Sequence, residues 1–116
     1  MSVDIENSKA QMRKGILEFC ILAILSEGDH YPTEIIERMK AARLLVVEGT
    51  LYPLLSRLKN EGLLTYRWEE SKSGPPRKYY ILTDSGKLFL HSLHESWAQL
   101  NSSVNQILQT AKIQIS

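Results

Sequence analysis

The sequence predicts a mainly α-helical domain with one small β-hairpin. Apolar residues recur at helical spacing along most of the chain, whereas "LLTYRWEE" at residues 63–70 and "RKYYILT" at residues 77–83 are rich in the β-branched and aromatic residues that strands favour. The chain has 116 residues, and its only stretch rich in Gly, Pro and Ser, "SKSGPP" at residues 71–76, is too short for a domain linker. We therefore expect one domain, which folds alone or as an obligate dimer.

Composition excludes several classes of protein. The 14 basic and 13 acidic side chains nearly cancel, so any basic surface must be local. The single Cys20 lies in an apolar run, where we expect a buried core residue, and one cysteine suits a reducing compartment. The longest apolar run, residues 16–25, is far shorter than the roughly 20 residues of a membrane span, and the N-terminus lacks a signal pattern. We expect a cytoplasmic protein without a membrane contact or a cofactor.

Two helices are predicted in the first third of the chain. Good helix formers fill residues 9–27, and Gly28 suits the C-terminal cap of a helix over that range. From residue 16 on this helix is apolar nearly all round, so we expect it to be buried on more than one side. Pro32 suits the first turn of a second, surface-lying helix over residues 32–42, whose apolar stripe consists of Ile35, Ile36 and Met39.

A short strand and a third helix follow in the prediction. The run "LLVV" at residues 44–47 suits a short strand. The third helix, over residues 48–62, has its apolar positions spaced at i, i+3, i+4 and i+7, and Gly62 ends it. These apolar positions are Leu51, Leu54, Leu55 and Leu58.

The hairpin and a long helix complete the chain. We expect its two strands to be joined by a loop too long for a tight turn, with Pro75 and Pro76 ending the strand pairing there. The last helix begins after an N-cap at Thr83 or Asp84 and runs to about Ala111. This order is that of a winged helix-turn-helix. We expect residues 1–83 to form that DNA-binding domain, including the N-terminal helix. Residues 84–116 are expected to form an appended C-terminal dimerisation helix, and the two parts make one compact unit.

The third helix carries an unusual outward face. If its leucines face the core, the helical period turns Gly49, Tyr52 and Pro53 outward together with Ser56, and places Arg57 and Lys59 at the margins. Such a face suits a DNA recognition helix, in which Gly49 and Thr50 allow close approach and the polar side chains contact phosphates or bases. The alternative is that Tyr52 packs on the wing or on a neighbouring helix.

A second basic group lies in the predicted wing. Lys72, Arg77 and Lys78 surround the loop, and residues 56–80 contain six basic and three acidic residues, a local surplus that the balanced total hides. Together with the recognition helix, the wing predicts contact with the DNA backbone.

At this point the sequence resembles the PadR family of bacterial transcriptional regulators. "GTLYPLLSRLKNEGLL", followed by Trp68, a Gly/Pro-containing loop and "RKYYILTDSG", is similar to the family's signature. The resemblance implies a dimeric winged-helix repressor on an inverted-repeat operator, with these residues on DNA: Thr33, Gly49, Thr50, Tyr52, Pro53, Ser56, Arg57, Lys59, Lys72, Arg77 and Lys78. Many members have Ser or Thr before the recognition helix, where this chain has Val47 and Glu48, which leaves the N-cap without the usual side-chain acceptor.

The last helix carries a regular apolar stripe that favours a dimer. Its members alternate in steps of three and four, and one small domain offers limited core to cover both this stripe and the apolar first helix. The alternative is that the stripe packs on the first helix of the same chain. The stripe consists of Leu90, Leu93, Trp97, Leu100, Val104, Ile107 and Ala111.

Trp97 interrupts this aliphatic stripe with a large ring. It either packs in the dimer core or, as the resemblance implies, lines a pore between subunits and stacks flat aromatic ligands, as in multidrug-binding members of the family's smaller subgroup with a single short C-terminal helix. The ligand and dimer candidates are Leu93, Trp97, Leu100 and Val104.

Catalytic and metal chemistry find little support in the sequence. His91 and His94 lie three residues apart beside Glu95, but two histidines without a clear third ligand are a weak metal signal. His30 beside Asp29 has no recognisable nucleophile nearby. We therefore predict a DNA-binding regulator released by a small aromatic effector, and no enzyme. The alternatives are a winged-helix protein-interaction module without DNA binding and a metal-responsive regulator.

Overall fold

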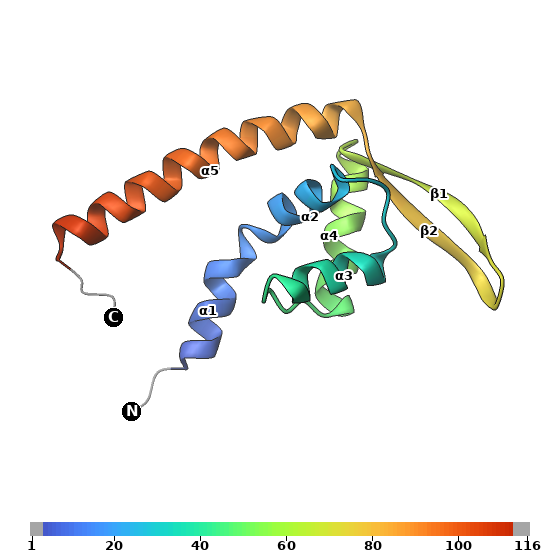
Figure 1. Ribbon diagram of the computed structural model, residues 1–116, viewed down its shortest axis with the longest axis horizontal. Helices are drawn as coiled ribbons and strands as arrows, with labels where there is room; N and C mark the ends of the chain where they lie inside the picture. Colours follow the sequence, from blue (N-terminus) through green and yellow to red (C-terminus); the bar gives the residue numbers. More distant parts are fainter. Residues whose placement is uncertain (1–3, 113–116) are drawn as a thin grey trace.

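The computed structural model describes residues 4–112 and confirms the mainly helical class with one hairpin (Figure 1). The elements are α1 (Ile5–Lys14), α2 (Leu17–Leu25), α3 (Pro32–Ala41), α4 (Glu48–Asn60), β1 (Leu64–Ser71), β2 (Gly74–Leu82) and α5 (Asp84–Thr110). The predicted winged-helix domain begins at residue 1 and the predicted C-terminal segment ends at residue 116. Residues 1–3 and 113–116 of these segments lie outside the described residues.

The first predicted helix is in fact two helices, so the expectation of one continuous helix is wrong. The turn at Gly15 and Ile16 separates α1 from α2, and the Ile16 N–H donates to the Arg13 carbonyl three residues back at 3.0 Å. The two segments face different surroundings. The polar α1 buries none of its residues, whereas α2 is apolar nearly all round and packs in the core. A glycine at the junction lowers the cost of ending the first helix there.

The predicted strand at residues 44–47 is also wrong. This segment forms no strand, because the Leu44 N–H donates to the Met39 carbonyl at 2.9 Å and closes the end of α3. A third stretch of backbone does pair with the hairpin, but it lies before α3. The His30 N–H and carbonyl bond to the carbonyl and N–H of Tyr80 on β2, at 3.3 and 2.9 Å.

The hairpin is longer and its turn tighter than expected. The antiparallel pairing runs from Leu64 opposite Leu82 to Glu69 opposite Arg77, shifts register, and resumes with Ser71 opposite Gly74. Only residues 72 and 73 remain in the turn, so Pro75 and Pro76 do not end the strand. The register shift explains this difference, because a bulge tolerates residues that have no N–H to donate.

The core lies between α2, α3, α4 and the base of the hairpin. Leucine, isoleucine and methionine side chains make up most of it, with Val46 and Tyr80, while Cys20 is only half-buried and packs against it. Burial raises the pKa of the Cys20 thiol above its ordinary value. Fully buried core residues are Ile21, Leu22, Ile35, Met39, Leu51, Leu55 and Leu58.

Two local motifs connect α4, the hairpin and α5. Gly62, with a φ of 80°, ends α4, and the Leu63 N–H donates to the Leu58 carbonyl at 3.0 Å. Thr83 is the N-cap of α5, as predicted: its hydroxyl accepts from the Gly86 N–H at 2.9 Å and donates to the Gly62 carbonyl at 2.8 Å. The start of α5 is therefore held directly on the end of α4.

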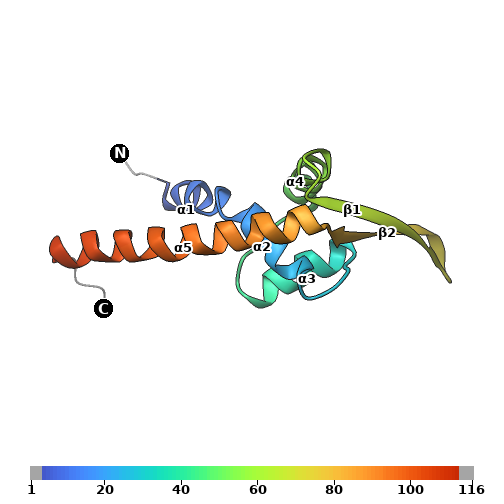
Figure 2. The ribbon, with the colours of Figure 1, turned by 90° about the horizontal axis from the view of Figure 1, so that it is seen from above.

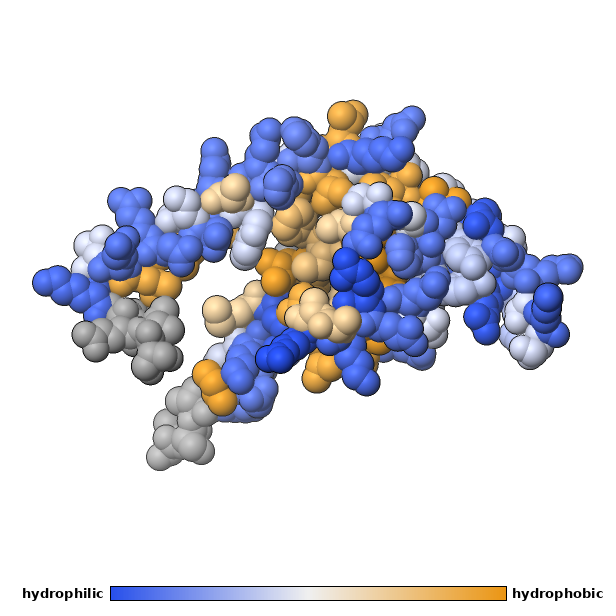
Figure 3. Space-filling model, viewed as in Figure 1, coloured by the Kyte–Doolittle hydropathy of each residue, from blue (hydrophilic) through white to orange (hydrophobic). Residues whose placement is uncertain are grey.

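The molecule is elongated because α5 extends well beyond the core. Its extents are 55 × 36 × 23 Å, and α1 and the far half of α5 form two arms that point to the same side (Figures 1 and 2). Figure 3 shows apolar residues gathered at the centre of one face, where α2 lies between these arms. Leu100, Val104 and Ile107 on the α5 arm are 58%, 46% and 66% exposed.

Candidate nucleic-acid interface

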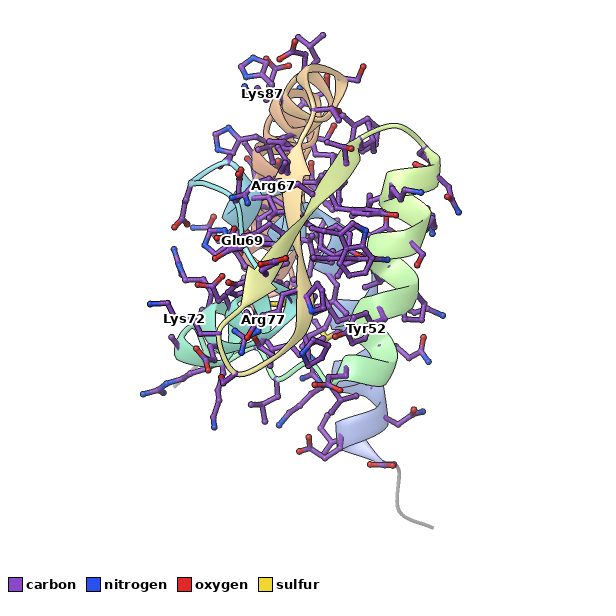
Figure 4. All side chains as sticks on the ribbon, turned by 90° about the vertical axis from the view of Figure 1, so that its right-hand side faces the viewer. Tyr52, Arg67, Glu69, Lys72, Arg77 and Lys87 are labelled. Carbon is purple, nitrogen blue, oxygen red and sulfur yellow. The ribbon has the colours of Figure 1, made fainter. Side chains whose placement is uncertain are left out.

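Helix α4 presents the outward face that the sequence predicts. Leu51, Leu55 and Leu58 are buried, whereas Tyr52, Pro53, Ser56 and the first-turn residues Gly49 and Thr50 are exposed. The N-cap residue Val47 has an extended backbone. It provides no side-chain hydrogen bond, because valine has no polar side-chain atom. Tyr52 is 45% exposed and lies between α4 and the hairpin (Figure 4).

A hollow of about 480 Å³ lies where α4, β2 and the start of α3 meet. It brings together predicted residues from all three elements, and it includes one aromatic residue of β1 that the sequence analysis did not assign to the site. That residue, Trp68, is 60% exposed. The side chains that line the hollow and could contact a nucleic acid are Thr33, Tyr52, Ser56, Trp68, Arg77 and Lys78.

The face of the hairpin toward α4 is aromatic and basic. Lys78 is opposite Trp68 in the pairing, and its ammonium lies 5.2 Å from the Trp68 ring and 4.4 Å from the Tyr66 ring. The Lys59 ammonium of α4 lies 5.3 Å from the same Tyr66 ring. Cations over aromatic faces are attracted by the ring electrons. The rings therefore hold two ammonium groups between α4 and the wing.

A second group of aromatic and basic side chains anchors the hairpin to the loop before α3. The rings of Tyr31 and Tyr79 lie 3.9 Å apart, and Arg67 and Arg77 each lie over one of them, at 4.4 and 5.0 Å. A hydrogen bond with Tyr31 is the main cause that raises the pKa of Tyr79 to about 12. Arg67 also pairs with Asp29 at 3.6 Å. This stack fixes the direction in which the wing projects.

The basic residues of the candidate site differ in their ion pairs. Arg57 pairs with Glu18 of α2 at 3.0 Å and with Glu61 at 3.3 Å, so its charge is compensated within the chain. Four other predicted residues have no carboxylate within 4.0 Å among residues 4–112: Lys59, Lys72, Arg77 and Lys78. Uncompensated cations attract phosphate more strongly, so these four are the candidates for phosphate contacts.

The ligand and dimer candidates lie on α5, which contributes none of the residues that line this hollow. Leu93 is half-buried against the core, and the Trp97 ring is 39% exposed with its centroid 6.4 Å from that of Phe19 on α2. Nearby, His91 pairs with Glu95 at 3.2 Å. In the described part of the chain, no three His, Cys, Asp or Glu side chains gather as a metal site would require.

The fold and the exposed basic face together define a winged-helix DNA-binding regulator. Residues 21–92 match the family model of the transcriptional regulator PadR-like family. The chain belongs to this family. Among residues 4–112, no helix combines the length and the apolar character needed to cross a membrane.

Solved structures and one curated relative agree with this assignment. The chain is 58% identical to a PadR-like transcription factor from Bacteroides fragilis, with a TM-score of 0.74 over 87% of this chain and 98% of that one. It is 31% identical to a PadR family transcriptional regulator from Eggerthella lenta, with a TM-score of 0.83 over 91% and 93%. The negative transcriptional regulator PadR of Bacillus subtilis is 31% identical over 66% of this chain, which corresponds to 43% of that protein.

Proposed function

We propose that this protein is a homodimeric repressor that binds an inverted-repeat operator in double-stranded DNA and is released by a small aromatic ligand. The observation that carries the proposal is the hollow in which the exposed Tyr52 and Ser56 of α4 meet the uncompensated Arg77 and Lys78 of the wing. A helix in the major groove reads base edges, while wing cations contact phosphates. Repression is supported by the Bacillus subtilis relative, a negative regulator.

The dimer is supported by the uncovered apolar residues of α5. Leu100, Val104 and Ile107 lie on one stripe of a helix that extends away from its own core. Two copies joined through this stripe would present two α4 helices related by a two-fold axis. A palindromic operator has the same symmetry, and each half-site would bind one copy.

Replacing Lys72, Arg77 and Lys78 with alanine is expected to weaken binding to all duplex sequences equally. The plot of log K against log salt should become shallower by about 0.9 for each lost phosphate contact. Fluorescence anisotropy of a labelled duplex at several salt concentrations measures this slope. A triple variant with the native slope contradicts the wing assignment, and a native protein without salt-dependent DNA binding would favour a protein-interaction module.

Replacing Tyr52 with alanine is expected to weaken binding to the operator by roughly 1–3 kcal/mol, the scale of one good base contact, with little effect on folding. The side chain is 45% exposed and is not part of the buried core, so the core keeps its packing. Affinity is measured on an operator selected from a random duplex library, and Tyr52→Phe separates the ring from the hydroxyl. A lower melting temperature at native affinity would show that Tyr52 has a structural role.

The ligand part of the proposal depends on Trp97. Its ring is partly exposed and borders the side of α5 that faces α2, where Phe19 is its nearest aromatic neighbour. A flat ligand that stacks on this ring gains about 0.5–1.5 kcal/mol beyond area burial, and more if it is cationic. Release of DNA requires that the ligand bind best to a dimer in which the two α4 helices are wrongly spaced for the operator.

Titration with a planar dye is expected to quench the fluorescence of Trp97. The variant Trp68→Phe, in which Trp97 is the only tryptophan, should keep the quenching, and Trp97→Phe should lose it. The paired variants separate the two sites because Trp68 lies on the wing and Trp97 on α5. Quenching that persists in Trp97→Phe and disappears in Trp68→Phe would end the ligand hypothesis.

A further inference from the structure

A second pair of uncompensated cations lies across α4 from the wing. Arg13 and Lys14 form the end of α1, and neither has a carboxylate within 4.0 Å in the part of the chain that the structure describes. Both line a hollow of about 340 Å³ together with Val47 and Thr50, at the start of α4. Figure 2 shows α1 and the hairpin on opposite sides of α4.

The side of α4 nearest to α1 has no uncompensated cation that belongs to α4 itself. Thr50 and Arg57 are seven residues apart and therefore share one side of the helix. Thr50 faces the hollow beside α1, while Arg57 is compensated by Glu18 and Glu61. Arg13 and Lys14 are the cations that line this hollow, and they can supply uncompensated positive charge there.

The core does not explain the position of these two residues. Helix α1 buries none of its side chains, so Arg13 and Lys14 are not needed to complete a packed surface. Cations in the last turn of a helix do stabilise the helix, because they interact favourably with its dipole. That role would affect folding and would leave DNA binding unchanged, so the two roles can be separated by experiment.

We propose that Arg13 and Lys14 form a second phosphate-binding site, so that the DNA backbone is held on both sides of α4. This inference rests on the proposed DNA-binding function. The major groove is about 12 Å wide and has a phosphate strand along each side. The wing cations reach one strand, and the pair on α1 reaches the other. The partner recognised is duplex phosphate, and the pair reads no base.

The double variant Arg13→Gln/Lys14→Gln tests the inference on the full-length chain. Anisotropy titrations of a generic duplex should give a salt slope shallower by about 0.9 for each lost contact. The control Arg38→Gln/Lys87→Gln removes the same charge from residues that pair with Glu27 and Asp84, at 2.6 and 3.8 Å, and should keep the native slope. Combining the double variant with the wing triple variant should give an additive change, because separate phosphates are lost.

Three results would overturn the inference. A native slope in the double variant, even with a lower melting temperature, would leave the two cations with only the helix-dipole role. An equal change in the control variant would show that net charge alone is responsible. Absence of salt-dependent binding by the native protein would overturn the proposed function and this inference together. If the wing triple variant has a shallower slope but the Arg13→Gln/Lys14→Gln variant has the native slope, this inference fails and the proposed DNA-binding function stands.

Discussion

Replacing Leu100, Val104 and Ile107 with lysine is expected to convert the protein from a dimer to a monomer. All three side chains are exposed in the single chain, so the fold of one copy does not depend on them. In the proposed dimer they would be buried, and burying unpaired ammonium groups costs several kcal/mol. Binding to an inverted repeat should fall by about 10²–10⁴, because the two half-sites then bind independently.

A matched variant on the same helix controls for the added charge. Ser102, Asn105 and Gln109 lie on the opposite side of α5 and are exposed, so their replacement by lysine should preserve the dimer and the DNA affinity. Size-exclusion chromatography with light scattering measures the oligomeric state. If the stripe variant remains a dimer, the interface lies elsewhere and the α5 part of the proposal fails.

Replacing Gly86 with alanine is expected to reduce the free energy of unfolding by about 3 kcal/mol, since overpacking a dense site forces the backbone to shift. A Cβ at this position would lie 2.2 Å from the Leu63 carbonyl oxygen and 2.6 Å from Leu82 Cδ1. The melting temperature should fall by roughly 10 °C. The loss should extend to DNA binding, because the same contact holds the start of α5 against the base of the wing.

Gly15→Ala provides the comparison for this prediction. Its Cβ would meet nothing within 4 Å, and its φ of −73° suits any residue. Alanine there should leave stability unchanged or raise it by up to about 1 kcal/mol, because it restricts the unfolded chain. Thermal melts of both variants by circular dichroism measure the difference. Equal melting temperatures for Gly86→Ala and the native protein would contradict the close approach at Leu63.

The sequence alone determined the elements whose signals are local. The leucine spacing of residues 48–62 predicted α4 and its outward face, and Thr83 predicted the start of α5. Such signals are readable because helical periodicity and N-capping depend on neighbours within one or two turns. The β-branched and aromatic residues of the hairpin were readable for the same reason.

Only the tertiary structure decided the features that depend on distant residues. The compensation of Arg57 by Glu18 joins positions 39 apart (57 − 18) in the chain, and no spacing rule predicts it. The hollow beside Trp68, the close approach of Gly86 to Leu63 and the position of Arg13 beside Thr50 likewise arise from packing between separate elements. The break at Gly15 belongs here too, because helix propensity is a weak signal that tertiary surroundings override, and α1 is exposed whereas α2 is buried.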